Sequence, residues 1–272
     1  MWMFLVYKEI KLFYHEKNKG GGATRNTAVA NSQAEVIFCL DSDDLLPPDT
    51  LSKMLKFLHE RKSDGVGFHK SIKFNSDNQN NVNYIDTSGY LDGKIPIGAL
   101  TSIDKFCPIY VNFMYTKEAF NKIGGYPTNH GFDTQGFAWR FLCSGLIAYT
   151  CPDTKYLHRT NFKESYYLRE YNQGKSNYNW RMILLENYFV FNQQTIKFIL
   201  NFNCSDFTDN LIMQLSKKKC IFDDARKATD EKNELIKGKS QKYRYIKRNS
   251  VNGYLLRIRR RFISKFSRNA CL

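Results

Sequence analysis

Three carboxylates lie within four residues, in the segment Asp41-Ser42-Asp43-Asp44. They follow residues 35–40, a continuous apolar run typical of a strand that is buried on both faces of a parallel sheet. Open α/β sheets bind ligands at the carboxyl ends of their strands. Carboxylates two residues apart at such an end can converge on Mg²⁺ or Mn²⁺, which prefer oxygen ligands and bridge phosphates. Asp41 and Asp43 therefore predict a divalent metal site, and the structural alternative is that these acids cap the turn and the following helix.

The elements around this segment predict an α/β architecture, because strands alternate with helices along the chain. Loops are expected where glycines or polar residues cluster, and the second helix is expected to open at two prolines. The expected strands are residues 10–14, 35–40, 106–114, 147–150 and 155–157; the expected helices are 23–31, 47–59, 116–123 and 134–143; the expected loops are 18–22 and 76–83.

Two groups of motifs, taken in order, resemble the family 2 glycosyltransferases of GT-A fold. The first group is Asn18-Lys19-Gly20, Ala23-Thr24-Arg25-Asn26, the apolar strand, the acidic segment, and then Pro47 and Leu51. The second is Phe120, Ile123-Gly124-Gly125-Tyr126, Asp133, Arg140, Gly145 and Tyr156-Leu157-His158-Arg159. The resemblance covers roughly residues 10–160. It implies a GT-A-like (Rossmann-like) sheet that binds a nucleotide sugar.

The resemblance also implies a role for each of five residues. Asp41 and Asp43 match the metal-binding DxD motif, which implies Mn²⁺ or Mg²⁺ as the cofactor. Arg25 matches the helix arginine near the nucleotide, and His158 matches a position near the metal and diphosphate in some members. Asp133 lies in the segment that supplies the general base in inverting members. The chemistry requires these residue types, because a metal neutralises the departing diphosphate and a carboxylate takes the proton of the attacking hydroxyl.

Alternatives remain for two of these residues. The acidic pair that is usual in the base segment is here Asp133-Thr134. Asp133 could therefore be the N-cap of the helix that follows, with His130 as a substitute base. His158 could be a structural histidine.

The resemblance also sets expectations for domain organisation. The family's first βα unit has no counterpart before Ile10, so we expect a sheet that is N-terminally truncated or completed by another chain. We expect residues 1–170 to form a partial GT-A-like domain. Residues 171–272 are expected to form a helical C-terminal region with a basic tail.

The basic residues of the chain are concentrated at its C-terminal end. The net charge is +15, but residues 235–272 hold twelve Lys and Arg and no Asp or Glu, which leaves 29 basic and 26 acidic residues elsewhere. In a helix over residues 255–268, the apolar side chains would share one face and most arginines the other. That pattern suits an interfacial helix on an anionic membrane, and the alternatives are packing on the domain or a solvated end.

The cysteines and the apolar runs bear on the compartment. There are seven cysteines, none in a CxxC pair, which favours reduced thiols. We find neither a signal peptide nor a run of the ~18 apolar residues that a membrane span needs. We therefore expect a cytoplasmic protein that is peripheral at the inner face of the cell membrane.

The expected function is metal-dependent transfer of a sugar from a nucleotide-diphosphate sugar to a glycan or a lipid-linked acceptor, with inversion implied by the resemblance. One alternative is a haloacid-dehalogenase-like phosphatase that uses Asp41 and Asp43, with Asp223-Asp224 as its later acidic motif. That alternative leaves three motifs unexplained, namely Ala23-Thr24-Arg25-Asn26, Gly124-Gly125 and His158-Arg159. A nucleic-acid binder is disfavoured because it gives the acidic segment no role. The third alternative is a catalytically inactive glycosyltransferase remnant.

Overall fold

The structure is a computed structural model of the 272-residue chain. It describes residues 10–74, 87–88, 93–102, 107–159, 169–170, 173–203, 211–218 and 221–222. Residues 1–221 form one compact unit and residues 222–272 a second, and the description below concerns the first. The predicted loop 76–83, the pair Asp223-Asp224 and the basic tail lie outside the described residues.

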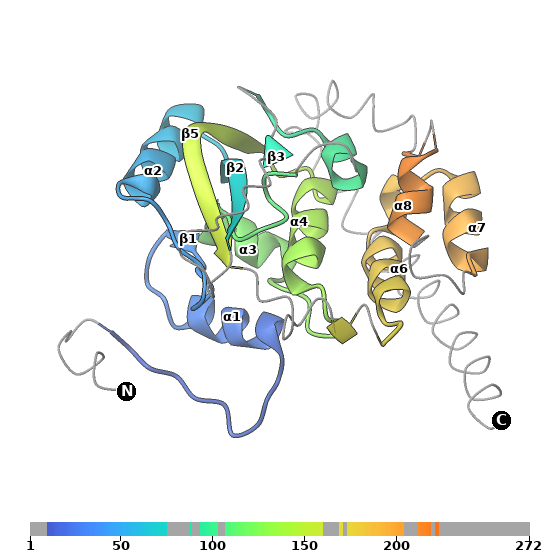
Figure 1. The fold of residues 1–272 in the computed structure, drawn as a ribbon, viewed down its shortest axis with the longest axis horizontal. Helices are drawn as coiled ribbons and strands as arrows, with labels where there is room; N and C mark the ends of the chain where they lie inside the picture. The colour runs from blue at the N-terminus through green and yellow to red at the C-terminus, as the bar shows by residue number, and fades with distance from the viewer. Residues whose placement is uncertain are drawn as a thin grey trace, which may run out of the picture. The chain divides into compact units, whose positions relative to one another are not determined.

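The described elements alternate between helices and strands, which confirms the α/β class (Figure 1). The strands are β1 (Val36–Phe38), β2 (Gly65–Phe74), β3 (Thr87–Ser88), β4 (Met114–Thr116) and β5 (Ala148–Arg159). The α-helices are α1 (Gly21–Ala30), α2 (Thr50–Arg61), α3 (Lys117–Ile123), α4 (Asp133–Cys143), α6 (Ser176–Glu186), α7 (Gln193–Asn201) and α8 (Leu211–Ser216). Two 3₁₀ turns, η2 (Ile97–Thr101) and η3 (Tyr188–Val190), complete the set.

The sheet is mixed. Its order is β1-β4-β2-β3, and β5 pairs with β2. β2 and β5 are parallel, whereas β1 pairs with β4 in the antiparallel sense, with Ile37 opposite Tyr115. The expectation that the run 35–40 belongs to a parallel sheet is therefore wrong for its pairing within the described residues. An apolar run reports burial of a strand on both faces and carries no information on its direction.

Helices cover both faces of the sheet (Figure 1). On one face, Met54 and Leu58 of α2 pack against Val66 and Phe68 of β2. The opposite face carries a cluster of aromatic rings, in which Phe113 contacts Phe137 and Phe141 of α4. Gly65 faces this side, because a Cβ there would lie 2.9 Å from the Phe141 ring. The carboxyl end of β1 is thereby held between two packed layers.

Several predicted elements differ from the observed ones. Residues 10–14 form no strand, and their side chains are largely exposed, as for Tyr14 at 85%. β2 was not predicted. The two short strands expected at 147–150 and 155–157 are one strand, β5, which continues through Asp153 in the left-handed region at φ 57°. The described part of the run 106–114 is irregular until Met114, where β4 begins.

Helices α6, α7 and α8 follow β5 in the chain and belong to the same compact unit. Trp180 of α6 packs edge-on against Phe132, and Trp139 of α4 packs against Phe191. The domain boundary expected near residue 170 stays a prediction, as does the completion of the sheet by a further unit. Within the described residues, no helix combines the length and apolarity that crossing a bilayer requires.

Candidate active site

The acidic segment forms a turn directly after β1, closed by a hydrogen bond of 3.1 Å from the Asp44 N–H to the Asp41 carbonyl. Its three carboxylates have different surroundings. The Asp41 side chain is partly buried and ion-paired, that of Asp43 is exposed, and that of Asp44 is buried. Within the described residues, no side chain or N–H group hydrogen-bonds to the Asp43 carboxylate. The segment therefore offers two carboxylates of different exposure to a ligand, and it uses the third internally.

Asp44 ties the turn to the end of β5. Its carboxylate accepts hydrogen bonds from the Tyr156 hydroxyl, from the Arg159 N–H at 2.8 Å and from His158 Nδ1 at 3.3 Å. Burial alone would raise the pKa of Asp44, but the hydrogen bonds from His158 and Tyr156 outweigh burial and lower it. An ionised carboxylate only accepts, so the proton of neutral His158 sits on Nδ1 and leaves the Nε2 lone pair unprotonated.

Arg25 joins two acids that lie far from it in sequence. One nitrogen of its guanidinium donates to Asp133 Oδ2 at 2.5 Å and the other donates to Asp41 Oδ1. The guanidinium also lies 5.7 Å from the centre of the Tyr126 ring. Its side chain is only 15% exposed. The structure thus brings together three of the five residues singled out from the sequence.

The charges in this cluster perturb one another. Burial alone would lower the pKa of Arg25, but the negative charges of Asp133 and Asp41 outweigh burial and raise that pKa above its ordinary value. Burial raises the pKa of Asp133 and the Arg25 charge partly offsets the rise. A carboxyl with a raised pKa is a better proton acceptor than a solvated one, which suits a general base. Arg25 stays charged throughout.

Close packing of α1 places Arg25. The helix begins after Gly20, which has φ 84°, and Gly22 approaches the Pro127 carbonyl so closely that a Cβ would lie 2.0 Å from its oxygen. The Asn26 side chain donates to the Tyr126 carbonyl at 2.9 Å and accepts from the Tyr126 N–H at 2.8 Å. Asn26 thereby fastens the first group of motifs to the second.

Asp133 is the first residue of α4, and Phe132 rather than Asp133 occupies the N-cap position. The Asp133 Oδ1 atom accepts from the Thr134 N–H at 3.0 Å, and its Oδ2 atom is held by Arg25. A carboxylate in the first helical turn is also favoured by the helix dipole. The residue is therefore held as an anion at a helix start without being the cap.

His130, the alternative base, is fully buried. Neither of its ring nitrogens has a hydrogen-bond partner among the described residues, and Nε2 lies 4.0 Å from Glu186 Oε2. Burial lowers its pKa, Glu186 opposes the shift and Arg140 adds to it. A ring with no exposed surface cannot meet an acceptor hydroxyl without rearrangement, so Asp133 is the better placed of the two.

His158 does not join the Arg25 cluster through any contact between described residues, and its partner is Asp44. Three contributors to the site were not singled out from the sequence: Asn26, Asp44 and Glu186. The first two lie inside the quoted motifs, so their neighbours provided a signal. Glu186 accepts hydrogen bonds from Arg140 and Asn129, which lie more than forty residues before it in the chain. No motif in the sequence around Glu186 indicates this role.

The residues at the strand end fit a divalent cation that arrives with a phosphate ligand. The described residues contain no group of three or more His, Cys, Asp or Glu that could hold an ion by themselves. Asp41 and Asp43 can supply two carboxylates. Mg²⁺ in phosphate-handling sites is commonly bound by one or two carboxylates together with substrate phosphates and waters. Asp41 is at present engaged by Arg25.

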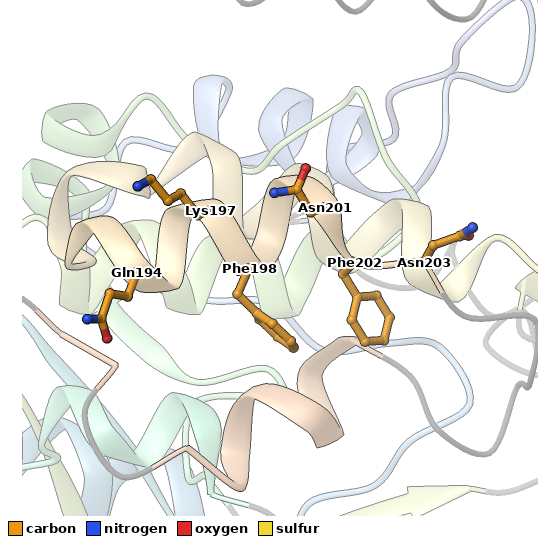
Figure 2. Close-up of a pocket in the computed structure, with 6 residues that line it drawn as sticks. All are labelled: Gln194, Lys197, Phe198, Asn201, Phe202 and Asn203. Carbon is orange, nitrogen blue, oxygen red and sulfur yellow. The ribbon is translucent and has the colours of Figure 1, made fainter.

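A separate pocket of about 500 Å³ lies on α7 (Figure 2). Figure 2 shows the Phe198 and Phe202 rings on the same side of the helix, and the Lys218 ammonium lies 4.1 Å from the centre of the Phe198 ring. Lys197 is the only titratable residue among the six that line it. The pocket has no carboxylate among the residues that line it and shares no residue with the Arg25 cluster.

Comparison with known proteins informs the family and the fold. Residues 5–124 match the family model described as glycosyl transferase family 2. An uncharacterized glycosyltransferase of Haemophilus influenzae is 33% identical over 85 residues, covering 31% of this chain and 33% of its own. One of Rickettsia felis is 33% identical over 100 residues, covering 36% of this chain and 15% of its own. The chain thus spans a third or less of these curated relatives.

Among solved structures, the fold resembles that of S. aureus TarS 1-349 in complex with UDP-GlcNAc, with a TM-score of 0.50 and 16% identity. The likeness covers 68% of this chain and 52% of the other. At that identity it informs the fold. The described core is therefore a GT-A-like fold, and residues 5–124 are similar to the glycosyl transferase family 2.

Proposed function

We propose that this protein transfers a sugar from a nucleotide-diphosphate sugar to a hydroxyl of a glycan or lipid-linked acceptor, with inversion at the anomeric carbon. The observation that carries the proposal is the contact of Arg25 with both Asp41 and Asp133. This contact unites a strand-end acid, a helix cation and a second acid in one partly buried site. Such a site can bind an anionic leaving group beside a base.

Each residue has a distinct role in this proposal. Arg25 binds diphosphate oxygens, for which its planar guanidinium is suited. Asp133 accepts the proton of the attacking hydroxyl. Asp41 and Asp43 would hold Mn²⁺ or Mg²⁺, and the ion would supply positive charge to the departing diphosphate. Asp44 fixes the turn and the tautomer of His158, which lies on the adjacent end of β5 and completes the donor site.

A turnover assay with UDP- and GDP-sugars and purified full-length chain tests the proposal. Asp133→Asn is expected to lower turnover by ~10²-fold or more while donor binding persists, because only the base is lost. Asp43→Asn is expected to weaken donor binding in the presence of Mn²⁺. Asp49→Asn is the matched control, since Asp49 lies on the next turn at φ 60°, which asparagine tolerates.

Two results would contradict the proposal. Undiminished turnover in folded Asp133→Asn would remove the assigned base. Absence of donor binding and turnover in the unmodified protein would favour the inactive remnant. The phosphatase alternative predicts release of phosphate from a phosphate ester, with loss in Asp41→Asn, and the family match and the GT-A-like fold weigh against it.

The acceptor and the place of action form a second part of the proposal. We propose that the basic tail, residues 239–272, brings the enzyme to the cytoplasmic face of an anionic membrane, where a lipid-linked acceptor would lie. The support is the segregation of positive charge into the tail and the apolar face that residues 255–268 would present as a helix.

A further inference from the structure

We propose that Arg25 is a donor-operated switch within the proposed transferase, on whose function this inference rests. Without donor, its guanidinium occupies the carboxylates of Asp41 and Asp133 and withholds both from chemistry. On donor binding, diphosphate oxygens replace the carboxylates at the guanidinium. Asp41 is then released to a divalent cation and Asp133 to the acceptor hydroxyl.

The contacts of Arg25 support the first state. Its terminal nitrogens are both committed to acids, with 2.5 Å to Asp133 and a direct ion pair to Asp41. A lone pair that accepts from a guanidinium is not available to a metal ion or a substrate proton, and the nearby positive charge makes the carboxylate a weaker ligand and a weaker base. Two of the three proposed working carboxylates are therefore engaged, and only Asp43 is exposed and without a hydrogen-bond partner among the described residues.

Charge balance determines the order of events. A cation bound at Asp41 while Arg25 remains paired there would lie within a few ångström of a second positive charge in a partly buried site. Like charges at that separation oppose each other strongly where water is scarce. A diphosphate supplies the negative charge that satisfies both cations. The metal and the diphosphate should therefore bind together much better than either binds alone.

The contacts of α1 indicate that the helix would stay in place while the Arg25 side chain moves. α1 is fixed by the close approach of Gly22 to Pro127 and by the paired hydrogen bonds between Asn26 and Tyr126. The Arg25 side chain is long, and its Nε–H is buried with no hydrogen-bond partner in the described part of the chain, so a donor remains for an oxyanion once the side chain moves. A side-chain rearrangement over a fixed helix can therefore operate the switch.

The test measures Mn²⁺ binding by the electron paramagnetic resonance signal of free Mn²⁺, with no nucleotide and with saturating UDP or GDP. In the unmodified protein, the nucleotide is expected to tighten Mn²⁺ binding ~10-fold or more. In Arg25→Gln, Mn²⁺ binding without nucleotide should be ~3- to 10-fold tighter than in the unmodified protein. The enhancement by nucleotide should fall below ~3-fold.

Two further variants make the test decisive. Arg61→Gln removes a positive charge that lies over the Phe57 and Tyr149 rings rather than at the proposed site, so the enhancement by nucleotide should persist. If Arg25→Gln does not fold, Arg25→Lys decides. The lysine ammonium keeps the positive charge but lacks the planar pair of donors of a guanidinium. The enhancement by nucleotide should therefore lie between that of the unmodified protein and that of Arg25→Gln.

The failures of the two proposals are distinguishable. Full enhancement in Arg25→Gln and Arg25→Lys, or equal Mn²⁺ affinity with and without nucleotide in a protein that turns over donor, would overturn the switch alone. Loss of enhancement in Arg61→Gln equal to that in Arg25→Gln would also overturn it, because removal of any positive charge would then suffice. An unmodified protein that neither binds nor turns over UDP- or GDP-sugars would overturn the proposed function.

Discussion

Replacing Gly22 by alanine tests whether close packing of α1 builds the active site. The Cβ added at this position would lie 2.0 Å from the Pro127 carbonyl oxygen and 3.2 Å from the Asp133 Cβ atom. Real Cβ contacts stay beyond about 3.0 Å, so helix and turn must separate by about 1.0 Å. The atom in the way is backbone, which cannot turn aside as the end of a side chain can.

The expected cost follows from two opposing effects. Alanine is favoured over glycine inside a helix by about 1 kcal/mol, and by less near the first turn, where Gly22 lies. Adding a methyl group to a tightly packed site costs about 1–3 kcal/mol. We expect a net loss of roughly 1–2 kcal/mol in the free energy of unfolding. In a domain of this size that corresponds to a fall in Tm of about 2–8 °C.

Differential scanning calorimetry of Gly22→Ala, with Gly98→Ala as the control, measures this effect. A Cβ at Gly98 would have no heavy atom within 4 Å, so that variant should keep its Tm or raise it slightly. The same displacement carries Arg25 away from Asp133, so Gly22→Ala should also weaken binding of the nucleoside diphosphate. A Gly22→Ala protein that melts at or above the unmodified temperature would refute the packing argument.

Three other perturbations have defined outcomes. Asp44→Asn should lower the free energy of unfolding by about 1.5–3 kcal/mol in urea titration, because buried Tyr156 loses a charged acceptor; an unchanged midpoint would contradict it. Burial lowers the pKa of His130, so the folded state binds fewer protons than the unfolded state, and stability is lost as the pH falls below about 6.5. The decline of Tm from pH 7 to 5 should be shallower in His130→Gln, and an equal slope would refute this. A chain ending at Gly238 should stay in solution when the full chain co-sediments with anionic vesicles, and equal partition would refute the membrane role.

The parts of the fold that follow from local pattern were predictable. The boundaries of α3 and α4 agree with the sequence to within a residue, because Thr116 caps one helix with a hydrogen bond of 3.1 Å and Gly124 ends it at φ 77°. The position of Asp41 and Asp43 in a turn after an apolar strand was also predictable from local sequence, whereas their binding of a metal ion stays a prediction. Capping, glycine conformation and strand-end position all act within a few residues.

Pairing partners were not predictable in the same way. The sequence run 65–74 mixes Phe68 and Ile72 with His69 and lysines, so its burial between β4 and β5 is a tertiary outcome. The run 10–14 has strand-forming residues and yet forms no strand, because no described strand lies beside it to complete a ladder. β-propensity describes what fits a pleated surface, and the neighbouring strands must supply that surface.

The position of Asp133 shows why the geometry of the site could not be predicted from local sequence patterns. On one side, its turn is held by α1 through Arg25 and through Asn26, about a hundred residues earlier in the chain. On the other side it is held by α6, where Asn179 accepts from the Gly131 N–H at 3.1 Å and Glu186 accepts from Asn129 at 2.8 Å. The proposed base is thus placed by two helices that do not share its neighbourhood in sequence. Helix α6, which lies beyond the predicted domain boundary, therefore contacts the turn that carries the proposed base, and we expect substitutions in α6 to alter turnover without contacting a substrate.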